Sequence, residues 1–509
     1  MRIKHGFGAI FIALSLSGPS LAQTPLTAID WMAQSAGQPR LPDTVLLEPP
    51  VSNSVISPEI QVTPLEALLP PLGLVPASST GLPVDLWRGS EVYTLSRLIA
   101  RVPVRDYPAM QSLLYTLLLT ESRPPAGDGA EDALLMARMD RLFALGAVDP
   151  VQAMMQLADP TATRARFAYW FDATLLTGDE DRACTALIAR PYLAPDDRAR
   201  IFCIARRGDW ETAALLLESI HALQLLSAPE RELLDRFLSP DIFEGAPPLP
   251  IPTDPDPLTF RLYETIGERL PTAPLLRAFA SADLRDVAGW KAQVEAAERL
   301  TRIGALSPNQ LLGLYTERRP AASGGVWDRV AALQRFETAL KAGSVDAMSK
   351  TLPVVWKAME SAGLETAFAD LFGEQLPVEG LSPAVQTLAW RIRLLSPAYE
   401  TAALTPPNDQ GGFLASLARG LPSPSLADTP IEQAIAEGFR DGAALPDQIQ
   451  RLLTNGQLGE AILRAMELFG HGASGNPQNL TQALASFRAV GLEDTARRAA
   501  LQLLLLERR

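Results

Sequence analysis

The chain has 509 residues, with 45 Lys and Arg against 58 Asp and Glu, a formal net charge of −13, two cysteines and three histidines. This length exceeds what one hydrophobic core normally holds, so we expect two or three folded units or a repeat array. The acidic balance argues against nucleic acid and anionic lipid as partners, because both need an excess of Lys and Arg to displace counterions.

The first 22 residues have the pattern of a secretory signal peptide. Arg2 and Lys4 precede an uncharged stretch, and Ser20 and Ala22 place small residues at positions −3 and −1 of a cleavage site. The uncharged stretch is shorter than the roughly 20 residues that span a bilayer, which favours cleavage over a retained membrane anchor. We therefore expect a bacterial periplasmic or secreted protein with no integral membrane span after cleavage.

Residues 23–87 are expected to form an extended linker, because eleven prolines forbid a continuous helix or a central strand. One amphipathic helix is predicted inside it, at about 26–36. Its candidate docking side chains are Leu26, Ile29, Trp31 and Met32. A helix of two to three turns is not stable alone in water, so its apolar face needs a groove on a partner or on this protein's own body. Simple disorder of the segment is the alternative.

From residue 88 onward the composition predicts an all-α fold. Ala, Leu, Arg and Glu dominate, and no period-two alternation typical of strands persists. Helix starts are marked at Ser307-Pro308 and at "APDDRARIFCIA", where a capping residue or an acidic first turn opens the helix.

A glycine joint recurs five times and predicts a series of helical hairpins. The spacings are 32 and 30 residues in the first three copies and 35 residues between the last two. Each glycine is expected to end a helix in a left-handed turn, and the apolar residues at +5 and +9 fall on one face of the next helix. The joints are Gly146, Gly178, Gly208, Gly456 and Gly491.

This period, with one glycine joint per unit, resembles the tetratricopeptide and Sel1-like repeats over residues 131–225 and 445–505. The large aromatic positions of those families are mostly absent here. The resemblance implies an α-solenoid, an architecture that usually binds other proteins. The alternative is a non-repetitive helical bundle whose helices end at ordinary glycine caps.

Two proline-rich segments divide the helical region. Residues 239–260 carry seven prolines, and residues 405–430 form a weaker Pro/Gly-rich break. We therefore expect three helical lobes, at 88–238, 261–404 and 431–509, of which the first and last contain the repeats.

Cys184 and Cys203 are the only cysteines, and in an oxidising compartment they are expected to form a disulfide. The bridge would close a loop of about 20 residues, worth roughly 3 kcal/mol in the chain-entropy model. It would clamp two helices that flank the "RPYLAPDD" turn. A catalytic or metal-binding pair is the alternative, but no CxxC spacing supports it.

Motifs for catalysis and cofactor binding are missing from the sequence. It contains no phosphate-binding GxxxxGK[ST] loop, no GxSxG nucleophile elbow and no HExxH zinc motif. His221 and His471 are the only histidines after residue 22 and lie far apart. We therefore expect no metal, no cofactor and no catalytic site.

The composition also resembles the α-superhelical domains of soluble lytic transglycosylases, which cleave peptidoglycan in the periplasm. Their catalytic domain has a Glu-Ser pair followed by a helical module. The nearest match here, Glu121-Ser122, runs directly into Arg-Pro-Pro. The resemblance keeps an envelope hydrolase as a rival interpretation.

One loop has an unusual composition and is a candidate anion or partner site. Backbone N–H groups at a helix start, beside two arginines, could hold a carboxylate or phosphate. The candidate residues are Arg318, Arg319, Gly324, Gly325, Trp327 and Asp328. The alternative is a solvated connecting loop whose tryptophan packs inward.

The function that we expect is a non-enzymatic periplasmic α-solenoid that presents a concave surface to another envelope protein. The proline-rich segment would act as a tether and its short helix as a second contact. The rivals are a peptidoglycan-acting hydrolase and a purely structural spacer.

Overall fold

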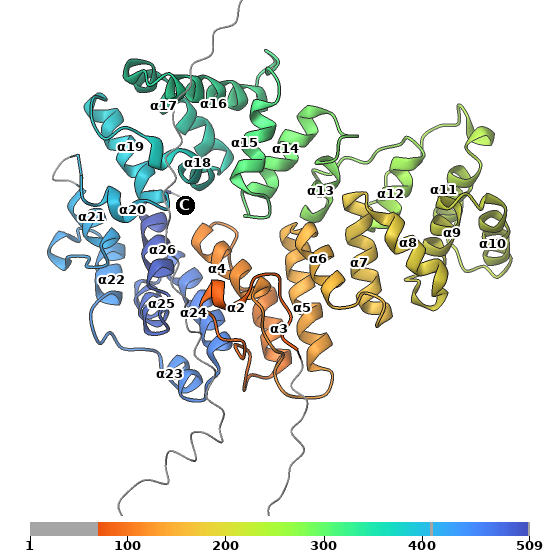
Figure 1. Cartoon of the computed structure of the whole chain (residues 1–509), viewed down its shortest axis with the longest axis horizontal. Coiled ribbons are helices and arrows are strands. Elements are labelled where there is room, and N and C mark those ends of the chain that lie inside the picture. Colours follow the sequence, from red (N-terminus) through yellow and green to blue (C-terminus); the bar gives the residue numbers. More distant parts are fainter. Residues whose placement is uncertain (1–69, 408–410, 507–509) are drawn as a thin grey trace, which may run out of the picture. The chain divides into compact units, whose positions relative to one another are not determined.

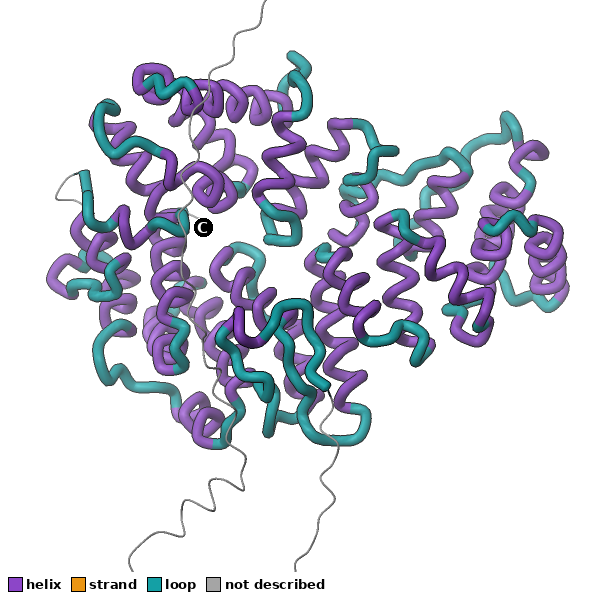
Figure 2. Tube along the Cα trace, in the orientation of Figure 1, coloured by secondary structure: helices purple, strands orange, loops and turns teal. Residues whose placement is uncertain are grey.

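A computed structural model describes residues 70–407 and 411–506 (Figure 1). The predicted signal peptide and the predicted docking helix with Leu26, Ile29, Trp31 and Met32 lie outside the described residues. As predicted, the fold is all-α (Figure 2). In the described residues no strand forms, and β-pairing is limited to two isolated bridges, Leu72 with Ser122 and Val75 with Thr120.

The first half of the described chain contains eleven α-helices. They are α2 (Ala77–Thr80), α3 (Val92–Arg101), α4 (Pro108–Leu119), α5 (Ala130–Leu145), α6 (Val148–Leu157), α7 (Arg164–Thr177), α8 (Glu180–Ala189), α9 (Asp197–Arg206), α10 (Trp210–Ala222), α11 (Ala228–Leu238) and α12 (Pro257–Thr265). Short 3₁₀ turns intervene at η2 (Pro191–Leu193) and η3 (Pro240–Phe243).

The second half continues with helices α13 to α26, the longest of which is α17 with 18 residues. They are α13 (Ala280–Asp283), α14 (Trp290–Thr301), α15 (Pro308–Thr316), α16 (Val326–Lys341), α17 (Val345–Ala362), α18 (Glu365–Phe372), α19 (Pro383–Leu395), α20 (Tyr399–Ala402), α21 (Gly412–Ala418), α22 (Pro430–Gly438), α23 (Asp447–Thr454), α24 (Leu458–Ala473), α25 (Pro477–Ala489) and α26 (Glu493–Leu505). The 3₁₀ turns here are η4 (Arg277–Phe279), η5 (Gly373–Gln375) and η7 (Pro424–Leu426).

The five glycine joints all have left-handed backbone conformations, with φ between 72° and 87°. Only glycine adopts this region at no steric cost. The residue five positions after each glycine is almost completely buried. These residues are Val151, Ala183, Ala213, Ala461 and Ala496. Their small size lets each helix lie close to its neighbour.

The predicted helix starts are also found. Ser307 forms a capping box with Gln310, and Pro308 occupies the first turn of α15. Asp196 caps α9 through a side-chain hydrogen bond from the amide of Ala199. Each cap satisfies backbone donors that have no partner inside the helix.

Contacts group residues 67–509 into one unit, and one buried core runs through most of it. Consecutive helices pack on one another, as α6 does on α7, α8 on α9 and α16 on α17. Helices α11 and α12 pack together across the proline-rich segment 239–260. The end of the expected linker also joins the core, since Leu86 and Trp87 are fully buried.

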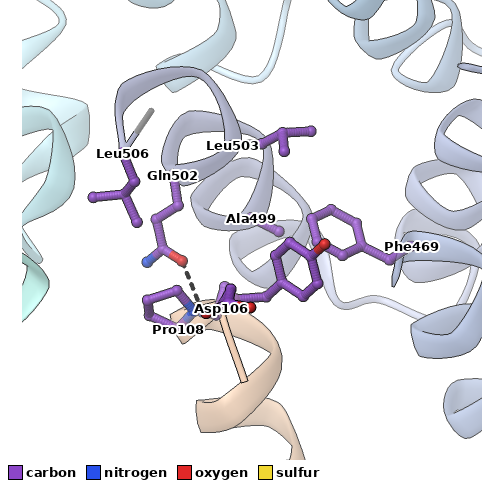
Figure 3. A pocket seen from close by; sticks show the side chains of 9 residues that line it. Asp106, Pro108, Phe469, Ala499, Gln502, Leu503 and Leu506 are labelled. Atoms are coloured by element: carbon purple, nitrogen blue, oxygen red, sulfur yellow. Dashed lines mark hydrogen bonds between the residues drawn. The ribbon is translucent and has the colours of Figure 1, made fainter. Parts of the chain in front are cut away.

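The C-terminal helices return to pack on the first ones (Figure 1): α24 lies against α3, and α26 lies against α4. Gln502 on α26 accepts a 2.7 Å hydrogen bond from the amide of Ala109 at the start of α4 (Figure 3). Gly459 lies against Trp87 and donates its amide to the carbonyl of Leu86 over 2.9 Å. The two ends of the described chain are thereby tied together.

The close approach of Gly459 to Trp87 generates a stability prediction. A Cβ atom at Gly459 would lie 2.5 Å from the Trp87 ring, which neither element can relieve without moving. Gly459→Ala should therefore cost about 1–3 kcal/mol of unfolding free energy, the usual price of overpacking, measured by urea denaturation. Gly313→Ala is the matched control, because Gly313 is also helical and has open space around it. The control should be neutral or stabilising by about 0.5–1 kcal/mol. Equal effects of the two changes would contradict the packing argument.

Candidate protein-binding groove

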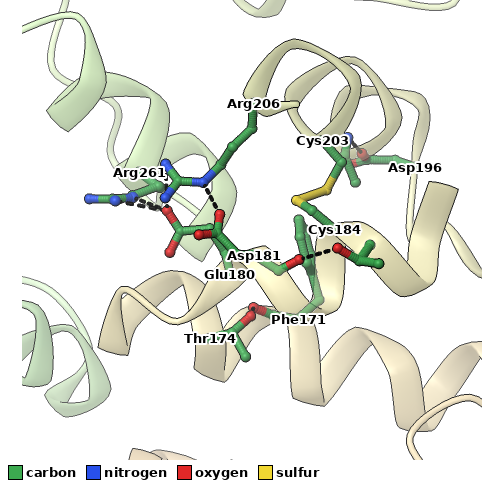
Figure 4. Close-up of a disulfide and its surroundings, with 11 residues drawn as sticks. Phe171, Thr174, Glu180, Asp181, Cys184, Asp196, Cys203, Arg206 and Arg261 are labelled. Carbon is green, nitrogen blue, oxygen red and sulfur yellow. Dashed lines mark hydrogen bonds and ion pairs between the residues drawn. A yellow bond between two sulfur atoms is a disulfide. The ribbon is translucent and has the colours of Figure 1, made fainter. Parts of the chain in front are cut away.

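The predicted disulfide is present and joins two consecutive helices. Cys184 on α8 and Cys203 on α9 are both buried and bonded to each other (Figure 4). The bridge holds the two helices on either side of the η2 turn. It therefore fixes the position of the C-terminal end of α9, where a groove begins.

This groove has a volume of about 500 Å³ and is bounded by the start of α8, by α9, α10 and α11, by η3 and by the end of α12. We call it the Trp210 groove. It is lined by Asp181, Phe202, Arg206, Trp210, Arg236, Phe237, Pro240, Thr265 and Ile266.

Three aromatic rings from three successive helices form the apolar part of the groove. The ring of Phe237 lies 5.7 Å from that of Phe202 and 5.8 Å from that of Trp210, measured between centroids. Phe202 is buried, whereas Trp210 remains 47% exposed. The stack thus holds a large aromatic surface rigidly at the protein surface, where a partner's side chain could cover it.

The glycine joint explains why Trp210 is held there. Gly208 turns the chain with a φ of 86°, and the side chain of Asp209 then accepts a hydrogen bond from the amide of Thr212. Trp210 is therefore the first residue of α10, beside the end of α9. Among the five joints this is the only copy with an aromatic residue two positions after the glycine.

The arginines at the groove are neutralised by acids. Arg206 pairs with Glu180 at 3.0 Å and with Asp181 at 2.7 Å, and Arg261 pairs with Glu180 at 2.8 Å (Figure 4). Glu180 is fully buried. A buried carboxylate needs such partners, because an unpaired charge inside the protein is very costly.

Arg236 is held in the same way. It pairs with Glu232 and with Glu268, each at 2.9 Å, and donates to the carbonyl of Pro247. Its guanidinium also lies over the ring of Phe243. The groove therefore offers an apolar aromatic surface between fixed and compensated charges, which suits an apolar side chain better than an anion.

Three exposed leucines lie on α10 and in the turn after it. Leu215 on α10 is 69% exposed, and Leu223 and Leu225 in the following turn are 68% and 61% exposed. Single exposed apolar residues are common on protein surfaces, so these leucines by themselves do not mark an interaction site.

The candidate anion loop has a different arrangement. Trp327 is buried, with its ring 4.5 Å from that of Trp290. Arg318 is exposed and pairs with its neighbour Glu317 at 2.8 Å, and Arg319 is exposed. The tryptophan thus packs inward, and anion binding by the loop stays a prediction.

The turn before α16 is built by the glycine pair of this loop. Gly324 and Gly325 have φ values of 81° and 68°. The amide of Asp328 donates to the carbonyl of Gly325 over 3.2 Å, so one donor of the helix start is already used.

The Glu-Ser pair considered for hydrolysis has a structural role at its serine. Ser122 is buried, and its hydroxyl accepts a 3.0 Å hydrogen bond from the indole of Trp87. In the described ranges, no group of three or more His, Cys, Asp or Glu side chains is placed to hold a metal ion. None of the described helices is both long and apolar enough to cross a membrane.

Sequence reasoning treated "RRGDW" as a joint and did not select Trp210 as a site residue. One feature of the sequence could have singled out Trp210. It is aromatic, whereas the other joints carry an aliphatic or acidic residue two positions after the glycine. Phe202 and Phe237 gave no signal, because buried and groove-lining phenylalanines look alike in a sequence.

Comparison of the chain with protein-family models, with curated proteins and with solved structures finds no match.

An acidic cluster beside the disulfide hairpin generates a prediction on pH. Burial raises the pKa of Asp172 on α7 to about 7, and the negative charges of Asp256 and Asp196 add to the shift, while Arg198 opposes it. The folded state therefore binds this proton more tightly than the unfolded state, whose aspartate titrates near 4. The stabilisation from protonated Asp172 is complete below about pH 4 and is lost as the pH rises towards 7.

Asp172→Asn should remove this dependence. Between pH 5 and 7 the wild type should lose up to about 1.4 kcal/mol of unfolding free energy per pH unit from this group, and the variant should have a flatter profile. Urea unfolding at pH 5, 6, 7 and 8 measures the difference. Asp128→Asn, at an exposed residue, should leave the wild-type profile unchanged. A parallel profile in the Asp172 variant would show that another group titrates.

Proposed function

We propose that the protein is a non-enzymatic periplasmic scaffold that binds another cell-envelope protein through the Trp210 groove. The observation that carries the proposal is Trp210 itself, half exposed and held against Phe237 at a groove of about 500 Å³. An aromatic side chain fixed in a concave site is typical of the residues that dominate the binding energy of protein interfaces.

The scaffold is proposed to be an α-solenoid of the tetratricopeptide or Sel1-like type. Five left-handed glycine joints with a buried small or branched residue five positions later support this architecture. Packing of consecutive helices on one another supports it as well. In such arrays the loops and helix ends of successive units combine into extended binding surfaces.

The partner segment is expected to insert a large apolar side chain between Trp210 and the α11–α12 side of the groove. Arg206 and Arg236 are already paired with acids, so polar groups of the partner would meet fixed charges at the edges of the groove. Such an arrangement contributes more to specificity than to affinity.

The envelope location rests on two features. The Cys184–Cys203 disulfide is favoured by an oxidising compartment. The first 22 residues have the charge and size pattern of a secretory signal. The proline-rich residues that follow would serve as a tether, and the helix at about 26–36 as a second contact.

The proposal is tested by capturing partners from periplasmic extract with residues 23–509 and measuring the affinity of the identified partner. Trp210→Ala should weaken binding by about 30-fold, because hot-spot tryptophans contribute 2 kcal/mol or more. The matched control is Tyr192→Ala, which removes an aromatic side chain that is 72% exposed outside the groove. It should bind like the wild type.

Two results would reject the proposal. One is equal binding by the wild type and the Trp210 variant, which would place the interface elsewhere. The other is a clearing band from the purified protein in zymography on cell-wall sacculi, which would establish the hydrolase interpretation instead.

A further inference from the structure

The proline-rich segment between α11 and α12 contains an extended stretch that lies on the protein surface. Residues 246–252 have the sequence APPLPIP and form no helix or strand. A proline fixes its own φ at about −65°, and the residue before a proline is held in the extended region. All seven residues fall under one of these two constraints, which together favour a polyproline II helix with three residues per turn. We call residues 246–252 the proline ridge.

Burial along the proline ridge follows the same three-residue period. Ala246, Leu249 and Pro252 are buried or half-buried. The residues between them are exposed, and they are Pro247, Pro248, Pro250 and Ile251. The exposed fraction of Ile251 is 72%. One face of the polyproline helix therefore anchors the ridge, and the other two faces present prolines and an isoleucine to solvent.

Two side-chain donors hold the backbone of the ridge on α11 and α12. Arg236 donates to the carbonyl of Pro247 over 2.9 Å. Tyr263 donates its hydroxyl to the carbonyl of Pro250 over 2.7 Å. These two carbonyls are three residues apart, as expected for one face of a polyproline helix. A segment that is already held in a fixed shape loses little conformational entropy when a partner binds it.

The other polar groups of the ridge show which face is available. The amide of Leu249 donates to the carboxylate of Glu268 over 2.7 Å, on the anchored face. The carbonyls of Pro248 and Ile251, also three residues apart, accept no hydrogen bond from the described residues. A partner can therefore donate to these two carbonyls without breaking a bond that holds the ridge.

Acidic side chains flank the ridge on both sides. Asp241 and Glu244 precede it, and Asp254 follows it. All three are exposed, and none forms an ion pair with the part of the chain that the structure describes. Residues 237–260 contain no Lys or Arg. The negative charge of the flanks therefore favours a partner that carries lysine or arginine around its docking surface.

We propose that the proline ridge docks into an aromatic-lined groove of a partner protein that has basic side chains at its rim. Tryptophan and tyrosine rings of the partner would pack on Pro248, Pro250 and Ile251. Their indole and hydroxyl groups would donate to the two available carbonyls. Proline-rich segments are recognised in this way because the polyproline II shape is fixed before binding.

A second copy of this chain matches the ridge less well than such a partner. The Trp210 groove has aromatic rings, but its arginines are already paired with acids. Two copies would also repel each other, since each carries a net charge of −13. No residue of the ridge lines the Trp210 groove, so the ridge is a separate interaction surface beyond the proposed function.

Site-specific photocrosslinking tests the proposal, with benzoylphenylalanine at Pro248 or at Ile251 of the full chain expressed in its own cells. Both positions should give a crosslinked product with the same protein. Mass spectrometry should place the crosslinks beside tryptophan or tyrosine residues of that protein, with Lys or Arg nearby. The control position is Leu421, which is 78% exposed and lies outside the ridge. It should not give this product.

Variants of the full chain then test the two kinds of contact by titration calorimetry with the crosslinked protein. Ile251→Asp should weaken binding about tenfold or more, because a charge would enter an apolar contact. Asp241→Asn, Glu244→Gln and Asp254→Asn together should weaken binding at low salt and make it less dependent on salt. Leu421→Asp is the matched control and should bind like the wild type. All of these positions are exposed, so each variant should melt at the wild-type temperature.

The proposal would be overturned if neither ridge position gave a product that the Leu421 position lacks. Crosslinks to a second copy of this chain, or to a surface without aromatic side chains, would also overturn it. So would wild-type affinity in the Ile251 variant. None of these results depends on the Trp210 groove, so this proposal and the proposed scaffold function can fail separately.

Discussion

The hydrogen bond between Gln502 and the amide of Ala109 marks the contact on which the rest of the structure depends. Helix α4 begins at Pro108, and the residue before it, Tyr107, has no side-chain cap, so the first amides of the helix lack a local partner. Gln502 supplies one from 393 positions away along the chain. The same return of the C-terminal helices places Gly459 against Trp87. A series of helices that touched only their neighbours would have no such constraint. The cavity of about 380 Å³ that α4 and α26 help to line would then not exist.

Features that depend on a few adjacent residues could be predicted from the sequence. The left-handed turns at the glycine joints, the Ser307 cap and the Cys184–Cys203 pairing each need only a local pattern or a count of two cysteines. The return packing could not be predicted, because its only local sign is a helix start without a capping side chain. Many helix starts are capped by water or by distant groups, so that sign does not identify α26 as the partner.

The loop around Trp327 and the Trp210 groove show that the prediction of functional sites from the sequence has the same limit. Sequence reasoning selected the loop around Arg318 and Trp327 for its unusual composition, yet Trp327 packs on Trp290 inside the protein. Trp210, in a less conspicuous context, is the tryptophan held at a groove. The two tryptophans follow glycines in similar ways. Whether each is buried depends on what the next helices bring to it, and a single sequence does not contain that information.

Arginine partners distinguish parts of this chain more sharply than composition does. At the Trp210 groove, Arg206 and Arg236 are paired with acids, among them the fully buried Glu180, so the charges of both arginines are compensated there. Other arginines, such as Arg299 and Arg302, are held by main-chain carbonyls, which orient a guanidinium without cancelling its charge. The net charge of −13 does not reveal this contrast, because it counts charged side chains in the same way whether or not the fold pairs them. The fold thus decides which arginines of one acidic chain are paired with acids and which are not.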